Sequence, residues 1–482
     1  MKLADLRRAG RSPQLPLTVQ LPQGDLAVQR WLRVLPNRRY VGVAEWRGRK
    51  VLAKLLVGGK AWRHYRRERD GARLLATQGL DTPLLLADGF QLDAGGWLLF
   101  DYLEDAQSLE QRWRGVASQP PLSDAQDEIL KDALRTLGKM HIKGLWQDDL
   151  HLDNLLYWQG RLYWVDGGSV QCGAPAQPLP QKLTLANLGM FFAQLPVKLD
   201  SHLDVLLDYY RHGNPDVVLS LPELHRQITK LRRWRLAGFM AKTGRECTFF
   251  SVRRGAMGLE IVRRDTSALL APLLDAPDQF VEKGTVLKGG DSTTVAKILV
   301  NGRDLVVKRY NIKNFRHWLR RLWRPSRGWH SWREANRLVF LGIATARPLA
   351  LVERRILWLR RGAYLVTDYL TGENVRIRFA PYVNSAPPEA ELSALEHLFS
   401  AMVRERISHG DLKGTNLIWH DGEWALIDLD AVRQHRCNLT FARAYARDRA
   451  RFLRNWPEDS ALHRLLDQRL PQVPGTCGLQ RG

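Results

Sequence analysis

The sequence carries the same series of polar residues twice, in the same order. Each series has a lysine at the end of a strand pattern, a glutamate in a helix pattern, an Asp-x4-Asn loop and an aspartate that ends an apolar strand. The residues are Lys54, Glu68, Asp149, Asn154 and Asp166 in the first half, and Lys308, Glu334, Asp411, Asn416 and Asp428 in the second. Matching residues are about 260 positions apart, whereas solenoid repeats have periods of about 20 to 50 residues. The repeat therefore predicts two complete domains in tandem.

Composition is compatible with two folded domains. The chain has 482 residues, of which 45% are hydrophobic and 26% charged, an ordinary globular balance that excludes global disorder. The weakly patterned stretch 264–279 contains two Ala-Pro pairs and is typical of a linker, so we expect domains at 1–265 and 266–482. The four cysteines form no CxxC pair, which indicates neither a disulfide framework nor a zinc site. We find no signal peptide and no membrane-spanning stretch, and expect a cytoplasmic protein.

Hydrophobic periodicity assigns the repeated residues to local elements. Alternation predicts strands over 51–56 and 305–308, each carrying the lysine, and apolar strands on either side of Gln159-Gly160 and of Asp421-Gly422. Helical spacing predicts helices over 65–76, 331–341, 134–142 and 395–407. The expected fold class is α+β, and the order of the repeated polar residues along these elements is typical of two tandem protein-kinase-like bilobal domains, each having a small β-rich lobe and a larger helical lobe.

The repeated series matches the requirements of phosphoryl transfer. That reaction needs a cation on the nucleotide phosphates, metal ligands that neutralise developing charge, and a carboxylate near the attacking hydroxyl. A strand lysine, a helix glutamate, an Asp-x4-Asn loop and a strand-end aspartate supply these groups in the order used by protein-kinase-like folds. For either lysine alone, the alternative is an edge-strand lysine whose charge reaches water beside a solvated glutamate. The order and repetition of the whole series favour the kinase-like reading.

The second half resembles a known family, the lipopolysaccharide core kinases, which comprise the bacterial heptose and 3-deoxy-manno-octulosonic acid kinases. The resembling segments are 288–295 (KGGDSTTV), 307–311 (VKRYN), 341–350 (LGIATARPLA) and 409–416 (HGDLKGTN). The resemblance covers roughly Phe280 to Trp456, and the first half looks like a more divergent member with its best match at 141–154.

The resemblance implies specific roles. Lys308 would bind the phosphates of ATP and pair with Glu334, Asp411 would orient or deprotonate the sugar hydroxyl, and Asn416 with Asp428 would hold Mg²⁺. Lys54, Glu68, Asp149, Asn154 and Asp166 would act in the same way in the first half. The phosphate loop would include Gly289, Gly290 and Ser292, whose backbone amides can wrap phosphate groups.

The corresponding loop of the first half is different. Residues 35–41 contain no glycine, which predicts more crowded backbone access to phosphates in that domain. Arg38 and Arg39 lie in this loop, and guanidinium groups can hold phosphate where backbone amides cannot.

Two further features keep open interpretations. Asp101 and Asp368, each followed by Tyr-Leu, lie either in hinges whose backbone binds adenine or in ordinary strand ends. His151 and His409 flank the Asp-x4-Asn loops, where a histidine is more often a structural hydrogen-bonding group than a proton shuttle. We assign the histidines no chemistry.

The formal net charge of +23 indicates an anionic partner. Segment 311–333 concentrates this charge, with arginines interleaved with four tryptophans and a single lysine. Tryptophan with arginine suits an anionic bilayer interface, and the alternative is a solvated basic helix. No nucleic-acid-binding module accompanies the segment, so we expect no nucleic-acid partner.

These observations predict an ATP-dependent, Mg²⁺-requiring kinase that acts on sugar hydroxyls of the lipopolysaccharide core and is peripheral on the inner membrane. After Asp428 the chain lacks the Ala-Pro-Glu element of protein kinases, which favours a small or lipid-linked acceptor over a protein. One alternative is a small-molecule phosphotransferase of the aminoglycoside or choline kinase type. Another is a non-catalytic module that binds nucleotide or lipid.

Overall fold

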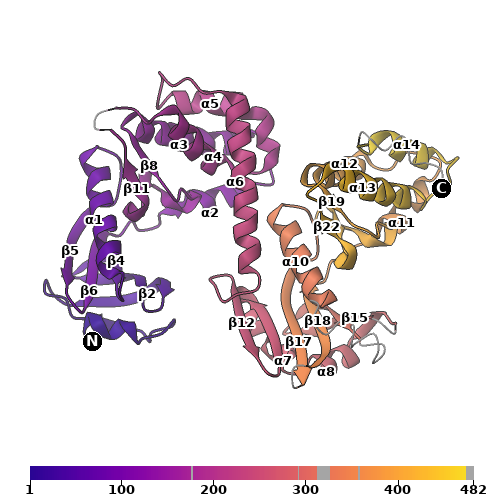
Figure 1. Ribbon diagram of the computed structural model, residues 1–482, viewed down its shortest axis with the longest axis horizontal. Helices are drawn as coiled ribbons and strands as arrows, with labels where there is room; N and C mark the ends of the chain where they lie inside the picture. Colours follow the sequence, from indigo (N-terminus) through magenta and orange to yellow (C-terminus); the bar gives the residue numbers. More distant parts are fainter. Residues whose placement is uncertain (175–176, 291–292, 312–325, 357–358, 474–482) are drawn as a thin grey trace. The chain divides into compact units, whose positions relative to one another are not determined.

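The computed structural model describes residues 1–174, 177–290, 293–311, 326–356 and 359–473. It is a mixed α/β structure, and its internal contacts divide the chain into two compact units, Met1–Arg233 and Trp234–Gly482 (Figure 1). Each unit combines an antiparallel sheet with a mainly helical part. No helix among the described residues is both long and apolar enough to cross a membrane.

The first unit opens with a six-stranded antiparallel sheet. Its order is β1-β2-β3-β4-β6-β5. The strands are β1 (Leu17–Val19), β2 (Leu26–Leu35), β3 (Arg39–Trp46), β4 (Arg49–Leu56), β5 (Leu85–Gln91) and β6 (Gly95–Asp101), and the 3-10 turn η1 (Leu3–Arg7) precedes them. Alternation along β4 places Val51, Ala53 and Leu55 in one core cluster, while helix α1 (Ala61–Thr77) buries Tyr65 in a cluster with Leu98.

Helices dominate the rest of the first unit. They are α2 (Leu109–Val116), α3 (Asp124–Ile142), α4 (Gln181–Phe192), α5 (Leu203–Arg211) and the first part of α6 (Leu221–Lys242). The short strands are β7 (Gln107–Ser108), β8 (Leu145–Gln147), β9 (Leu155–Trp158), β10 (Arg161–Trp164) and β11 (Val170–Cys172), with 3-10 turns η2 (Leu152–Asn154), η3 (Gly167–Ser169) and η4 (Val197–His202). Ser108 and Gln111 form a capping box at the start of α2. Leu134 and Leu137 of α3 pack in the same core as Leu206 of α5. This packing fixes α3, the helix that precedes the loop 147–154.

The second unit contains a seven-stranded antiparallel sheet. Its order is β12-β13-β17-β18-β16-β15-β14. The strands are β12 (Phe250–Gly255), β13 (Gly258–Arg263), β14 (Thr285–Lys288), β15 (Thr293–Val300), β16 (Arg303–Tyr310), β17 (Pro348–Ile356) and β18 (Leu359–Asp368). Helix α10 (Arg327–Phe340) packs on β17 and β18, with Trp332 and Ala335 fully buried.

The helical part of the second unit follows this sheet. Its helices are α11 (Val375–Arg378), α12 (Glu389–Glu405), α13 (Asn438–Leu453) and α14 (Ala461–Arg469). Its short elements are β19 (Ile407–Ser408), β20 (Leu417–His420), β21 (Glu423–Leu426), β22 (Arg433–Gln434), η6 (Ala380–Tyr382), η7 (Gly414–Asn416) and η8 (Leu429–Ala431). The strand and helix types expected around both repeated series are confirmed.

The stretch expected to be a linker is folded into the second unit. Residues 264–279 form η5 (Arg264–Thr266), α7 (Ser267–Asp275) and the start of α8 (Pro277–Lys283), and Leu270 and Leu273 are buried in the core of the second sheet. The linker prediction is wrong, because burial of the leucines of α7 stabilises this helix more than its proline, Pro272, destabilises it. The strands β12 and β13, which the sequence assigned to domain 1–265, also join the second sheet, since β13 pairs with β17.

Candidate functional site

A buried ion pair forms the centre of the site in the first unit. Lys54 lies on β4, which is hydrogen-bonded to β3 on one side and β6 on the other, so it is not an edge-strand residue. Its Nζ donates to Oε2 of Glu68 on α1 at 2.5 Å, and the two residues are only 8% and 4% exposed. The predicted pairing of Lys54 with Glu68 is confirmed, and the alternative of a solvated lysine is wrong for this unit.

Asp166 joins this pair from the end of the β9–β10 hairpin. Its Oδ1 lies 3.3 Å from Nζ of Lys54. Asp166 adopts a left-handed conformation with φ of 65° and starts η3. Helix α1 can approach this turn because Gly71 has no side chain: a Cβ there would lie 1.9 Å from the carbonyl oxygen of Gly167. Close backbone packing thus holds the lysine, the glutamate and the aspartate together.

An arginine from the glycine-free loop enters the same cluster. Nη1 of Arg39, at the start of β3, lies 3.5 Å from Oε1 of Glu68 and 3.8 Å from Oδ1 of Asp166. Arg33 on β2 interacts electrostatically with Arg39, Asp166 and Asp149. The first unit therefore surrounds its acidic residues with side-chain cations, and phosphate binding by Arg38 and Arg39 stays a prediction.

The ionisation of the cluster follows from burial and charge. Burial alone would lower the pKa of Lys54, but Glu68 and Asp166 outweigh it and raise that pKa. Burial would raise the pKa of Asp166, but Lys54 and Arg39 lower it well below its usual range. Burial raises the pKa of Glu68, the most enclosed of the three. Lys54 is thus a cation and Asp166 an anion across the physiological range.

The Asp-x4-Asn loop of the first unit is ordered by the buried asparagine. Nδ2 of Asn154 donates to the backbone oxygen of Asp149 at 2.9 Å and to Oε1 of Gln147 at 3.0 Å. These bonds engage the amide nitrogen and leave the amide oxygen as the atom suited to a cation. The carboxylate of Asp149 is exposed, with one oxygen 3.1 Å from Nε2 of His151.

The lysine of the second unit has different partners from those predicted. Nζ of Lys308, on the internal strand β16, lies 2.5 Å from Oδ1 of Asp428 and 2.8 Å from Oδ1 of Asp430. Glu334 on α10 instead binds Arg337, one turn along the same helix, with an Nε to Oε2 distance of 2.8 Å. The predicted pairing of Lys308 with Glu334 is wrong, because Arg337 neutralises the glutamate and Asp430 supplies the carboxylate that the lysine needs.

Asp430 is the functional residue that sequence reasoning missed. Its carboxylate accepts hydrogen bonds from Tyr310 at 2.8 Å, Ser331 at 2.7 Å and Arg327 at 2.6 Å, in addition to its contact with Lys308. Burial would raise the pKa of Asp430, but Lys308 and the hydrogen bonds lower it to about 2. The signal in the sequence is the second acid of Asp428-Leu-Asp430, which stands where the first half has Gly168.

A buried aspartate on α13 holds the second Asp-x4-Asn loop. The carboxylate of Asp448 accepts from the backbone N–H of His409 at 2.6 Å and from that of Gly410 at 3.0 Å. Nε2 of buried His409 lies 2.9 Å from the carbonyl oxygen of Ile427, which joins the loop to the strand before Asp428. The interpretation of His409 as a structural hydrogen-bonding residue is confirmed.

Asp411 itself is held by two cations. Its Oδ1 lies 2.6 Å from Nη1 of Arg451 on α13, and its Oδ2 lies 3.0 Å from Nζ of Lys413. Burial would raise the pKa of Asp411, but Lys413 and Arg451 outweigh it and lower that pKa. Nδ2 of Asn416 donates to the backbone oxygen of Asp411 at 2.8 Å, as Asn154 does to Asp149 in the first unit.

The glycines of the second loop connect β14 to β15. Gly289 and Gly290 follow the end of β14, and the carbonyl oxygen of Gly290 accepts from Nδ2 of Asn311 at 3.3 Å. A Cβ at either glycine would meet no atom closer than 3.5 Å, so the loop backbone is uncrowded. Ser292, the third residue predicted here, lies outside the described residues.

The tryptophan-rich segment 311–333 ends in the core of the second unit. Residues 312–325 lie outside the described residues. At its far end, Trp332 is fully buried and donates from Nε1 to the carbonyl oxygen of Thr243 at 2.9 Å. A bilayer-interface role is therefore wrong for Trp332, because the packing of α10 on the sheet places it in the core.

The strand ends proposed as hinges carry paired side chains. Asp101 lies 3.0 Å from Arg49, and Asp368 lies 2.7 Å from Arg303. Each aspartate side chain thus forms an ion pair with the neighbouring strand of its sheet. Binding of adenine by the backbone of these hinges stays a prediction.

Across the described residues, no group of three or more histidine, cysteine, aspartate or glutamate side chains is arranged to hold a metal ion. Each repeated series instead supplies one aspartate and one asparagine. This set suits Mg²⁺, which binds through one or two carboxylates plus substrate phosphates more often than in an all-protein cage.

Comparison with known proteins finds similarity only among solved structures. No family model matches the chain, and no curated protein matches it significantly. WaaP in complex with acyl carrier protein is 20% identical, with a TM-score of 0.33 over 44% of this chain and 88% of that chain. The kinase domain of PknI from Mycobacterium tuberculosis is 17% identical, with a TM-score of 0.28 over 43% and 95%. WbdD bound to a kinase inhibitor is 18% identical, with a TM-score of 0.29 over 45% and 48%.

Proposed function

We propose that the chain is an ATP-dependent, Mg²⁺-requiring kinase with two tandem kinase-like domains, and that it phosphorylates sugar hydroxyls of the lipopolysaccharide inner core. The observation that carries this proposal is the pairing of a strand lysine with the strand-end aspartate in both units, at 3.3 Å for Lys54 and Asp166 and at 2.5 Å for Lys308 and Asp428. Residues more than 100 positions apart meet twice in the same combination, next to an ordered Asp-x4-Asn loop.

The side chains fit a nucleotide bound with a metal ion. Lys54 and Lys308 would hold nucleotide phosphates, while Asp166 with Asn154, and Asp428 with Asn416, would hold Mg²⁺. When bound, Mg²⁺ neutralises the negative charge that develops on the phosphates during transfer. Because each lysine lies next to the aspartate that would bind Mg²⁺, the lysine and the metal ion would contact the phosphates from neighbouring positions.

Asp411 would position the acceptor hydroxyl in the second unit. Its lowered pKa makes it a weak base, so orientation of the hydroxyl contributes more than proton abstraction before transfer. Arg451 and Lys413 hold the two carboxylate oxygens in place and also bring positive charge to the point where the acceptor must enter.

Helix α13 supports an anionic acceptor. Arg443, Arg447, Arg451 and Arg454 are spaced by four, four and three residues, so they lie along one helix face. Arg451 contacts Asp411, whereas the other three are exposed and form no ion pair with the described residues of this unit. A stripe of guanidinium groups that ends at the acceptor-orienting aspartate suits a sugar substrate bearing phosphate or carboxylate groups. The net charge of +23 supports a peripheral position at the anionic inner-membrane surface.

The test is transfer of labelled phosphate from ATP by the purified full-length chain to core lipopolysaccharide that lacks phosphate. We expect transfer to depend on Mg²⁺ and to be lost in the Asp411→Asn variant. The matched control is Asp421→Asn, which changes an exposed carboxylate in the turn of the neighbouring hairpin. Transfer to aminoglycosides or choline but not to the core would favour the small-molecule alternative, and nucleotide binding without any transfer would favour the non-catalytic module.

A further inference from the structure

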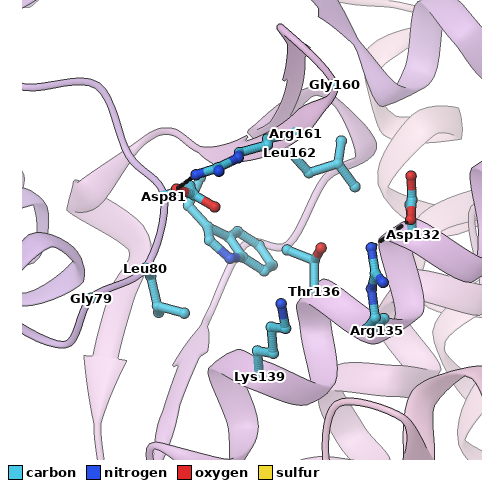
Figure 2. A pocket seen from close by; sticks show the side chains of 11 residues that line it. Gly79, Leu80, Asp81, Asp132, Arg135, Thr136, Lys139, Gly160, Arg161 and Leu162 are labelled. Carbon is cyan, nitrogen blue, oxygen red and sulfur yellow. Dashed lines mark hydrogen bonds and ion pairs between the residues drawn. The ribbon is translucent and has the colours of Figure 1, made fainter.

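The first unit contains a polar cavity built from none of the residues of the lysine cluster. It has a volume of about 450 Å³ and lies between the turn after α1, one face of α3 and the start of β10. Cavities of a few hundred Å³ are the size of small-molecule sites. Figure 2 shows Asp81 and Arg161 on one side, Asp132 and Arg135 on the other, and Lys139 extending toward the space between them.

Helical spacing aims one face of α3 at this cavity. Asp132, Arg135, Thr136 and Lys139 are separated by three, one and three residues, which places them on the same side of the helix. Nη2 of Arg135 lies 2.9 Å from Oδ1 of Asp132, so the arginine is held in position by its own helix. Lys139 is exposed and forms no ion pair within the described part of the chain.

The charges in the cavity do not cancel. Arg135, Lys139 and Arg161 supply three cations, against the two carboxylates of Asp81 and Asp132. Arg161 lies 3.9 Å from Asp81, too far for a hydrogen bond. The cavity thus has one positive charge in excess and also has carboxylate oxygens able to accept hydrogen bonds.

The floor of the cavity contains a donor without an acceptor. Trp164 is fully buried and lines the cavity, and its Nε1–H has no hydrogen-bond partner among the described residues. Buried donors are nearly always paired in proteins, because an unpaired donor loses its bonds to water without compensation. The Nε1 atom of Trp164 has no exposed surface, however, so the excess of cations on the exposed side of the cavity is what favours an anionic ligand.

We infer that this cavity binds a sugar monophosphate at a second site, separate from the lysine cluster. Lys139 and Arg161 would hold the phosphate, whose charge matches the excess of cations. Asp81 and Asp132 would accept hydrogen bonds from sugar hydroxyls, which a simple inorganic anion lacks. Leu80 and Leu162, which also line the cavity, would offer a small apolar surface to the ring.

The experiment is calorimetric titration of the full-length chain with glucose-6-phosphate, glucose and inorganic phosphate. We expect glucose-6-phosphate to bind with one-to-one stoichiometry and more tightly than the other two. The Lys139→Gln and Arg161→Gln variants should each weaken this binding by about tenfold or more, because each loses a charged contact. Lys131→Gln, on α3 but outside the cavity lining, should bind as the wild type does.

Three results would overturn the inference. They are no binding of glucose-6-phosphate at millimolar concentrations, unchanged binding in both Lys139→Gln and Arg161→Gln, and binding of inorganic phosphate as tight as that of the sugar phosphate. The altered side chains are exposed, so we expect both variants to fold, and an unchanged thermal unfolding profile confirms it.

Discussion

The two units pair their strand lysines with carboxylates from different places in the fold. In the first unit, the partner of Lys54 is Glu68 on helix α1, whereas in the second unit Asp430, two residues after Asp428, takes that role for Lys308. Gly168 occupies the position of Asp430 in the first unit, and a Cβ there would lie 2.9 Å from Oε1 of Glu68. The space next to the strand lysine is thus filled by Glu68 in the first unit and by Asp430 in the second.

A second exchange on the helix completes the difference. Gly71 lies three residues after Glu68 and allows α1 to approach the backbone of Gly167. The same helix position in the second unit is Arg337, which binds Glu334 and so removes that glutamate from the lysine. The strand lysine thus has a carboxylate partner in both units, but that partner precedes the Asp-x4-Asn loop in the first unit and follows it in the second.

The largest expected effect tests which unit transfers phosphate. Asp411→Asn should reduce transfer to core lipopolysaccharide by about 100-fold to 10,000-fold, because it removes the group that orients the hydroxyl. Nucleotide affinity, measured by calorimetry, should change little, since Asp411 contacts Arg451 and Lys413 rather than Lys308. Full transfer by this variant, with loss of transfer in Asp149→Asn, would show that the first unit is the active one.

The next prediction tests the exchange of lysine partners. Asp430→Asn should destabilise the second unit by about 3 kcal/mol and weaken nucleotide binding there, because it leaves the partly buried Lys308 with one carboxylate fewer. Glu334→Gln removes the charge of a buried carboxylate and so also costs stability, but it should leave nucleotide binding nearly unchanged, since Glu334 contacts Arg337 rather than Lys308. Nucleotide titration of both variants measures the contrast. Equal losses of nucleotide affinity in the two variants would mean that Glu334 supports Lys308 after all.

A third prediction concerns the close approach of helix α1. Gly71→Ala should destabilise the first unit by about 1 to 3 kcal/mol, because the new Cβ overlaps the carbonyl oxygen of Gly167. Displacement of α1 should also lengthen the Lys54 to Glu68 contact and weaken nucleotide binding in that unit. Gly79→Ala is a poor control because Gly79 has a positive φ, so Gly115→Ala, which meets no neighbouring atom, serves instead. If Gly71→Ala unfolds at the same denaturant concentration as the wild type, α1 does not pack as closely on the turn at Gly167 as the structure shows.

A fourth prediction follows from the pKa of Asp430. A carboxyl group with a lowered folded-state pKa stabilises the fold fully above its unfolded pKa and loses this contribution as the pH falls through the folded value. The pKa of Asp430 is about 2, against a usual 3.8, so it should contribute about 2 kcal/mol that disappears between about pH 4 and pH 2. Acid unfolding followed by fluorescence should show a shallower pH dependence in this window for Asp430→Asn. An identical acid transition in the variant would argue against the described network.

The smallest expected effect concerns the arginine stripe of α13. The double variant Arg443→Ser with Arg447→Ser should raise the KM for core lipopolysaccharide several-fold and leave kcat nearly unchanged, because exposed charges contribute binding rather than chemistry. The difference from wild type should shrink at high salt, which screens exposed charges. A change in kcat without a change in KM would assign these residues to the site itself.

Much of the architecture is readable from local patterns. Alternating residues around Lys54 and Lys308 predict their strands, and helical spacing predicts the helices that carry Glu68 and Glu334, because each pattern reflects the burial of one face. Local patterns fail where long-range packing decides. The stretch 264–279 reads as a linker until its leucines meet the second sheet, and Trp332 reads as an interface residue until α10 places it in the core.

The sequence by itself determined that two copies of one acidic and basic series exist and in which elements they lie, because each element has its own hydrophobic pattern. Only the tertiary structure decided which carboxylate each lysine binds. The ammonium group of each lysine binds a carboxylate that lies within hydrogen-bond distance. In the first unit, Gly71 and Gly168 leave the space in which Glu68 approaches Lys54. In the second unit, Arg337 binds Glu334, and Asp430 lies next to Lys308 instead. Contacts between segments so far apart along the chain depend on backbone packing, which local sequence patterns do not encode.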